Sequence, residues 1–249
     1  MDWLIICLGA GIGYLLGSLN GAVIISRGIY KSDIREHGSG NAGTTNMLRT
    51  FGKGAALLTL LFDFAKGILA CVLAGLLVKY CSARFSYFDG VCTGGLFAVF
   101  GHNWPIYFGF KGGKGVLTGF AVMLMISPYA ALCALGVFIV IVAITRYVSL
   151  GSVLAAFSLP LFVLLFRLLE HKTAFSYSLV VSIIFALLII VRHHTNIARL
   201  IKGTESKLSF KSHKSAADDA APAETETAAD NIAAAEAADN TAAGQGEQL

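Results

Sequence analysis

The most regular feature of this 249-residue chain is a succession of long apolar runs separated by short polar segments. The runs lie at about residues 3–26, 55–78, 87–101, 115–145, 151–168 and 174–191. Most have the length of a helix that crosses a hydrocarbon core of about 30 Å. The pattern therefore predicts an all-α integral membrane protein.

The run at 115–145 is too long for one ordinary span, and Ser127-Pro128 lies near its middle. A residue that precedes proline is driven out of helical geometry, so we expect a tight hairpin at this point. Two short spans on either side bring the prediction to a seven-transmembrane-helix bundle with short and hairpin-like spans.

The basic residues determine the expected orientation, because cytoplasmic loops carry an excess of Lys and Arg. With seven spans and the amino terminus outside, 14 of the 19 basic residues lie in cytoplasmic segments. With six spans, the loop that contains Arg146 would be cytoplasmic only if another loop departed from the alternation between the two sides of the membrane. We therefore expect the carboxyl terminus in the cytoplasm. The start, MDWLII, has an acid where a signal peptide has bases, so the first run should remain as a span.

Composition supports the membrane prediction and separates the end of the chain from the rest. Hydrophobic residues make up 56% and charged residues 14%, with a mean hydropathy of +0.71. After residue 214 there are eight acids, 14 alanines and no base. We expect residues 1–210 to form the membrane domain and 211–249 an alanine-rich, acidic, disordered cytoplasmic tail. The five scattered cysteines predict neither a zinc site nor a disulfide framework.

The polar segments are unusual in composition, and the seven-span topology collects four of them on the cytoplasmic face. They are GSGNAGTTNMLR (38–49), GHNWPIYFGFKGGKG (101–115), RYVSLGS (146–152) and RHHTNIARLIKGTESK (192–207). Because all four meet one membrane surface, we expect them to form one site.

The first polar segment fits G-x-G-x-x-G but lacks the strand and the βαβ unit of a dinucleotide-binding fingerprint. Its glycines would still let backbone N–H groups approach a phosphate, at the start of a helix near Gly43. Arg49 adds a forked cation that suits a phosphate or a carboxylate. The alternative is an ordinary polar turn. The candidate ligands are Ser39, Gly40, Asn41, Thr45, Asn46 and Arg49.

The second segment contains GFKGGKG (109–115), which is similar to a Walker A loop but is one spacer short. Gly115 also stands where a Ser or Thr would hold magnesium, so nucleotide hydrolysis is not expected. What remains is a phosphate cradle of Gly112, Gly113 and Gly115 with two point charges, Lys111 and Lys114. The alternative is that the lysines only set the topology.

The last two segments add weaker signals. Arg146, Ser149 and Ser152 supply a cation and two hydroxyls, although taken alone they are better explained by a topology-setting Arg with a serine cap. His193 and Asn196 are three residues apart where the last span ends. His193 suits a proton acceptor or a hydrogen-bond donor to phosphate, and the alternative is a basic belt on anionic lipid.

Two charges lie inside the second apolar run. Asp63 and Lys66 are three residues apart on one helix face. Charges inside a membrane are costly, so we expect a mutual or interhelical pair. The pair would stabilise the bundle or line a polar path.

In this order and between short spans, GSGNAGTTNMLRTFG, GHNWPIYFGFKGGKG, RYVSLGS and HHTNIARLIKGTE resemble the bacterial acyl-phosphate:glycerol-3-phosphate acyltransferases, the PlsY family. The resemblance covers about residues 1–207. It departs from the expected motif at Ala42-Gly43-Thr44 and at Asn103-Trp104, and neither change removes a charged residue.

The resemblance implies an enzyme of the bacterial inner membrane with its active site at the cytoplasmic face. It would transfer a fatty acyl group from acyl phosphate to the 1-hydroxyl of glycerol 3-phosphate, giving lysophosphatidic acid and inorganic phosphate. No cofactor, metal or nucleic acid is implied, and the enzyme that makes acyl phosphate is a candidate partner besides membrane lipids. The residues that would surround the phosphates are Ser39, Arg49, Lys114 and His193, with Asn41, Asn196 and the glycines 112, 113 and 115 holding the substrates.

Acyl phosphate is already an activated anhydride, so positioning and charge stabilisation can supply most of the catalysis. We expect direct attack by the glycerol hydroxyl, with a substrate phosphate or His193 taking the proton, and Ser39 as a covalent nucleophile is the alternative. A membrane transporter of a phosphorylated solute is the main alternative function, although the sequence contains no convincing repeat.

Overall fold

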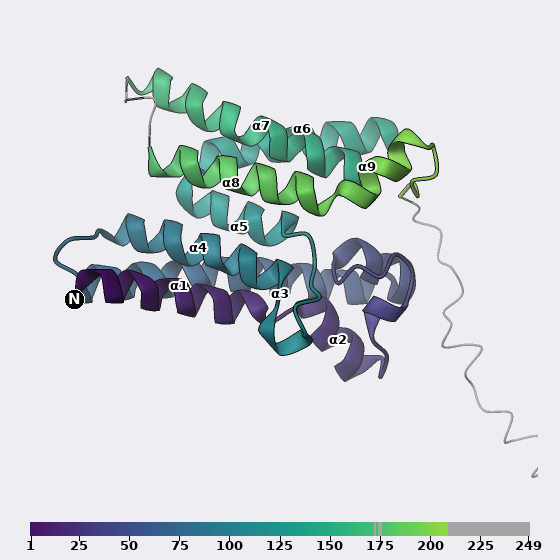
Figure 1. Ribbon diagram of the computed structural model, residues 1–249. Helices are drawn as coiled ribbons and strands as arrows, with labels where there is room; N and C mark the ends of the chain where they lie inside the picture. The colour runs from purple at the N-terminus through teal and green to yellow at the C-terminus, as the bar shows by residue number, and fades with distance from the viewer. Residues whose placement is uncertain (172, 174–175, 209–249) are drawn as a thin grey trace, which may run out of the picture. The chain divides into compact units, whose positions relative to one another are not determined.

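The computed structural model describes residues 1–171, 173 and 176–208, so the predicted tail at 211–249 lies outside the described residues. The regular elements of the described chain are all helices (Figure 1), and two are single 3₁₀ turns, η1 and η2. The helices are α1 (Asp2–Ser18), α2 (Gly21–Ile29), η1 (Ile34–Glu36), α3 (Thr44–Cys81), α4 (Tyr87–Asn103), η2 (Ile106–Phe108), α5 (Val116–Ile126), α6 (Pro128–Thr145), α7 (Val148–Leu169), α8 (Tyr177–Arg192) and α9 (His194–Ile201).

The first apolar run forms two helices rather than one. α1 ends at Ser18, and Asn20 caps α2 by accepting a hydrogen bond from the backbone N–H of Val23 at 3.1 Å. An asparagine side chain bonds to nearby backbone groups and so favours a helix start over a helix interior. The break turns the chain before it reaches the first polar segment.

Two predictions that rest on local chemistry are confirmed. α3 begins at Thr44, directly after extended Gly43, as the glycine-rich segment predicts. α5 ends at Ile126 and α6 begins at Pro128, so the break falls at Ser127. Proline at the first helical position costs no hydrogen bond, and this explains why α6 starts there.

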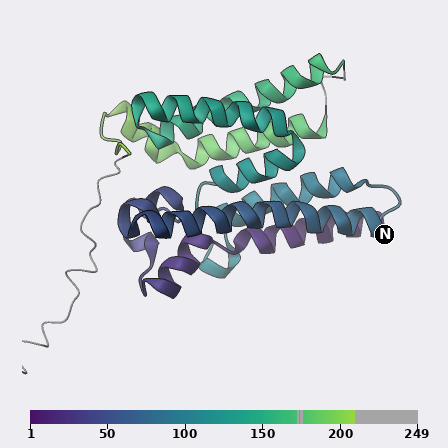
Figure 2. The same ribbon diagram turned by 180° about the vertical axis from the view of Figure 1, so that it is seen from behind.

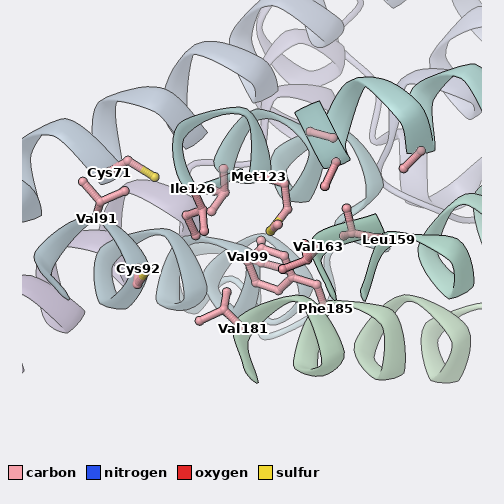
Figure 3. Close-up of a cluster of buried hydrophobic side chains, with 14 residues drawn as sticks. Cys71, Val91, Cys92, Val99, Met123, Ile126, Leu159, Val163, Val181 and Phe185 are labelled. Carbon is pink, nitrogen blue, oxygen red and sulfur yellow. The ribbon is translucent and has the colours of Figure 1, made fainter. Parts of the chain in front are cut away.

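Small residues let α1 lie directly against α4. A Cβ atom on Gly13 would lie 2.1 Å from the carbonyl oxygen of Gly94, and one on Gly17 would lie 2.1 Å from that of Ala98. α3 packs on both of these helices, α5 packs on α3, α4, α6 and α8, and α7 packs on α6 and α8. The apolar side chains of α3, α4, α5, α7 and α8 meet in one buried cluster (Figure 3), which includes Cys71, Val99, Met123, Val163 and Phe185.

By length and composition, four helical segments of the described chain could cross a membrane: Asp2–Ile29, Thr44–Cys81, Pro128–Thr145 and Val148–Leu169. A fifth is added if α8 and α9, which are bent by 57° at His193, count as one broken span. The fold is thus an all-helical multi-pass membrane bundle, as predicted. The count of seven spans and the orientation of the termini stay predictions.

The polar segments gather at one end of the helices. The amino-terminal part of α3, the loop before α5, and α9 lie together at the end opposite the amino terminus of the chain (Figures 1 and 2). Segments that are more than 100 residues apart in the sequence are thereby brought together at one surface.

We expect Gly17→Ala to destabilise the protein, because a new methyl group there meets the backbone of α4, which cannot rotate away. Overpacking of this kind costs about 1–3 kcal/mol. Gly11→Ala on the same helix is the control, since no atom lies within 4 Å of its Cβ position and alanine favours helices. Thermal unfolding in detergent should show a lower midpoint for Gly17→Ala alone. Equal midpoints for the two variants would contradict this packing.

Candidate functional site

A cavity of about 640 Å³ lies where the four polar segments meet. Its wall includes parts of α3, α5, α6, α7, α8 and α9 together with the loops at the polar end. Most of the predicted site residues line it: Ser39, Asn41, Thr45, Asn46, Arg49, Lys114, Gly115, Ser149, Ser152, His193 and Asn196. All four polar segments therefore contribute to one cavity wall, as predicted, and the role of this cavity as the site stays a prediction.

Five predicted residues are not part of the cavity wall: Gly40, Lys111, Gly112, Gly113 and Arg146. Gly40 has a positive φ of 69° and shapes the first loop. Arg146 ends α6, and its carbonyl oxygen accepts a hydrogen bond from the N–H of Leu208 at 2.7 Å. These residues support the site from outside it.

Asn46 holds the first polar segment in shape. Its side-chain oxygen accepts a hydrogen bond from the N–H of Ser39 at 3.0 Å, and its amide donates to the carbonyl oxygens of Ile34 and His37 at 3.1 and 2.9 Å. A side-chain amide has two donors, so both are committed to the loop. Asn46 thus orients Ser39, while its own donors are not available to a ligand.

The glycine loop before α5 is held by arginines from two other segments. Arg35 donates to the carbonyl oxygen of Lys111 at 3.2 Å, and Arg192 donates to that of Gly113 at 2.9 Å. The Arg192 guanidinium also lies over the Trp104 ring, 5.5 Å from its centroid. Two planar guanidinium groups therefore fix the backbone that leads to Lys114.

Lys114 is a partly buried cation of the cavity wall. Its ammonium group donates to the side-chain oxygen of Asn196. Burial lowers the pKa of Lys114 to about 8; Glu205 opposes this shift, and Arg199, Arg192 and Arg49 add to it. Burial and neighbouring cations disfavour the protonated form of Lys114, and a bound anion would stabilise that form.

Glu205 is a site residue that the sequence analysis did not single out. Its carboxylate accepts hydrogen bonds from the amide of Asn196 at 2.6 Å and from Nε of Arg199 at 2.7 Å. Burial alone would raise the pKa of Glu205, but these two bonds bring it below its usual value. The sequence signal that could have identified Glu205 is that it is the one carboxylate in the otherwise basic segment 192–207.

The segment around Glu205 also contacts the rim of the cavity. Arg49 donates to the carbonyl oxygen of Ser206 at 3.0 Å, and Lys207 lies over the Tyr147 ring, 5.5 Å from its centroid. The carboxylate of Glu205 thus lies among the residues that the sequence predicted to bind an anion. The polar end of the cavity therefore already surrounds one negative charge, that of Glu205.

His193 lies between α8 and α9 and is only 3% exposed. Its Nδ1 is 2.7 Å from the carbonyl oxygen of Ile189, which can only accept, so Nδ1 carries the proton in the neutral ring. Nε2 is then the nitrogen with a free lone pair. His193 can accept a proton or, once protonated, donate a hydrogen bond to an anion.

Apart from Asp63 and His102, the rest of the cavity wall is mostly apolar. Its lining includes side chains from α3, α5, α6, α7 and α8: Phe64, Phe120, Met123, Ala131, Ala134, Leu135, Phe138, Ala155, Ala156, Leu159, Phe185 and Ile189. Between Ser149 and Leu159, ten residues along α7 correspond to about 15 Å of helix. The cavity can therefore hold a molecule with an anionic end and a long apolar part.

Comparison with known proteins gives a consistent result. The family model described as glycerol-3-phosphate acyltransferase matches residues 6–203. The chain is 42% identical over 205 residues to the glycerol-3-phosphate acyltransferase of Clostridioides difficile, covering 81% of this chain and 95% of that one. It is 45% identical over 200 residues to the enzyme of the same name from Shouchella clausii, covering 80% and 94%.

Solved structures agree with the sequence relatives. The chain is similar to the crystal structure of PlsY (YgiH), an integral membrane glycerol 3-phosphate acyltransferase, in its glycerol 3-phosphate form. The TM-score is 0.70 at 35% identity, and the match covers 82% of this chain and 96% of that one. The lysophosphatidic acid form of PlsY matches with a TM-score of 0.67.

We expect anion binding to weaken as the pH rises through about 8, because Lys114 loses its proton there. Sulfate is a suitable probe, since its own charge does not change over this range. Titration calorimetry of the full chain in detergent should show weaker binding at pH 9.5 than at pH 7. Lys114→Arg should remove this loss, because arginine stays protonated. Equal pH dependence in the two proteins would exclude Lys114 as the titrating group.

Proposed function

This chain belongs to the glycerol-3-phosphate acyltransferase family, and we propose that it takes its acyl group from acyl phosphate. The reaction moves the acyl group to the 1-hydroxyl of glycerol 3-phosphate and gives lysophosphatidic acid and inorganic phosphate. The observation that carries the proposal is the cavity with an anion-binding end and an apolar remainder. The comparisons do not support the alternative of a transporter for a phosphorylated solute.

A donor that is itself a phosphate requires the positive charge that the polar end provides. Two dianions 6 Å apart repel each other by about 11 kcal/mol at an effective dielectric constant of 20. Arg49, Lys114 and Arg199 supply cations around the polar end, and His193 adds a group that can be protonated. The three cations offset the repulsion and help to hold the two substrates at reacting distance.

We assign the chemical step to direct attack. The 1-hydroxyl oxygen of glycerol 3-phosphate forms a bond to the carbonyl carbon of the donor, and the bond from that carbon to the phosphate oxygen breaks. The hydroxyl proton passes to the departing phosphate or to Nε2 of His193. Lys114 and Arg49 stabilise the charge that develops on the leaving phosphate. In the described chain no base is hydrogen-bonded to Ser39, which favours direct attack over a covalent acyl-enzyme.

The acyl chain fits the apolar part of the cavity, between α5, α6, α7 and α8. Glycerol 3-phosphate is soluble and enters at the polar end. This division agrees with a site at the cytoplasmic face of a bacterial inner membrane, in which α4 and α5 act as short spans and the chain crosses seven times with its amino terminus outside. The excess of basic residues in the polar segments supports this orientation.

The purified chain in detergent should release lysophosphatidic acid from glycerol 3-phosphate and palmitoyl phosphate, with no other protein added. We expect no product when palmitoyl-CoA replaces palmitoyl phosphate, because the donor phosphate is the group that the cations hold. Product can be followed with radiolabelled glycerol 3-phosphate. Arg49→Ala should lower the rate by about 100-fold, as expected when one charge-stabilising donor is lost. Turnover with palmitoyl-CoA alone would refute the proposed donor.

The far end of the cavity should limit the length of the acyl chain. Ala131 on α6 lines the cavity and is 1% exposed, so Ala131→Phe fills space there. We expect kcat/KM to fall more for a 16-carbon acyl phosphate than for a 10-carbon one. Leu132→Phe is the control, because Leu132 is 53% exposed and lies outside the cavity. An equal loss for both chain lengths would place the acyl chain elsewhere.

A further inference from the structure

A buried charged cluster, of which Asp63 and His102 reach the cavity wall, has no part in the proposed reaction. Asp63, Lys66 and His102 are 2%, 4% and 5% exposed. The Asp63 carboxylate is 2.7 Å from the Lys66 ammonium, which is in turn 3.0 Å from Nδ1 of His102. Burying such charges is costly even when they are paired, so the cluster needs an explanation beyond stability.

Part of the cluster satisfies backbone groups at the break between α1 and α2. Lys66 donates to the carbonyl oxygen of Leu19 at 2.9 Å, and Asp63 accepts from the N–H of Gly21 at 3.2 Å. These are groups that a helix end leaves without an intrahelical partner. This contact explains Asp63 and Lys66, but it does not require a histidine at position 102.

The ammonium group of Lys66 determines the state of the His102 ring. An ammonium group has donors only, so Nδ1 of His102 must accept, and the ring proton lies on Nε2. The carboxylate of Asp63 is 3.7 Å from Nδ1, which is longer than its distance to Lys66. Asp63 and Lys66 are therefore the ion pair, and His102 is a neutral ring that the pair orients.

The other side of His102 faces the glycine loop. A Cβ atom on Gly113 would lie 2.2 Å from Nε2, and one on Gly112 would lie 2.1 Å from the carbonyl oxygen of His102. The same carbonyl oxygen accepts the N–H of Gly113 at 3.1 Å. The guanidinium group of Arg192 donates a hydrogen bond to the carbonyl oxygen of Gly113 at 2.9 Å. Contacts with His102 and with Arg192 thus fix the turn before Lys114.

We propose that Asp63, Lys66 and His102 form a positioning unit for Lys114. The ion pair orients the His102 ring, the ring and its carbonyl oxygen fix the turn at Gly113, and the turn sets the position of the Lys114 ammonium. None of the three needs to touch a reacting atom. The inference rests on the proposed function only in that Lys114 binds a substrate phosphate.

The test is a double-mutant cycle between His102 and Lys114, with glycerol 3-phosphate affinity measured by titration calorimetry. His102→Asn keeps an acceptor for Lys66 near the Nδ1 position but removes the edge that contacts Gly113. We expect it to weaken binding by about 10-fold or more in the wild-type background. In a Lys114→Ala background the same change should have less than about a 2-fold effect, because coupled residues are not additive.

Thr59→Val is the matched control. Thr59 is also buried on α3, one turn before Asp63, and its hydroxyl donates to Ala55 within the same helix. We expect it to leave the affinity unchanged, and the unfolding midpoints of all variants are measured alongside. Equal losses from His102→Asn in both backgrounds would overturn the positioning role. A wild-type chain that binds no glycerol 3-phosphate would instead refute the proposed function.

Discussion

The buried ion pair between Asp63 and Lys66 is the interaction on which both halves of the site depend. On one side it satisfies the carbonyl oxygen of Leu19 and the N–H of Gly21, where α1 gives way to α2. That break directs the chain toward the first polar segment. On the other side it orients His102, which contacts the glycine loop before α5. In an apolar setting such a pair cannot exchange its partners for water, so it holds the two segments in one arrangement.

Within the site, the chain balances its own cations before any substrate arrives. Lys114, Arg199 and Arg49 would repel one another strongly if they were left alone in a partly buried cavity. The carboxylate of Glu205 and the backbone around Ser206 supply the opposing partners, all from one short segment after α9. This explains how several cations can lie around one cavity, and why the segment that follows the last helix packs against its wall.

Much of the architecture followed from local chemistry. Proline at 128 restricts the residue before it, and the glycines up to Gly43 are poor helix formers, so the break at Ser127 and the start of α3 could be predicted from local sequence. The pairing of Asp63 with Lys66 was also predictable, because residues three apart share a helix face. The break at Asn20 was not expected, since a single polar residue inside an apolar run does not reveal whether its side chain caps a helix.

The sequence by itself determined that the chain is a helical membrane protein, which of its segments are polar, and which residue types could bind phosphate. The reason is that hydrophobic length, glycine content and charge are properties of short segments. Only the tertiary structure decided what each polar side chain does. Asn46 shapes its own loop, Glu205 opposes the cations, and His102 contacts the turn at Gly113. Such roles depend on contacts between residues up to about 150 positions apart, and packing creates these contacts without leaving a local pattern.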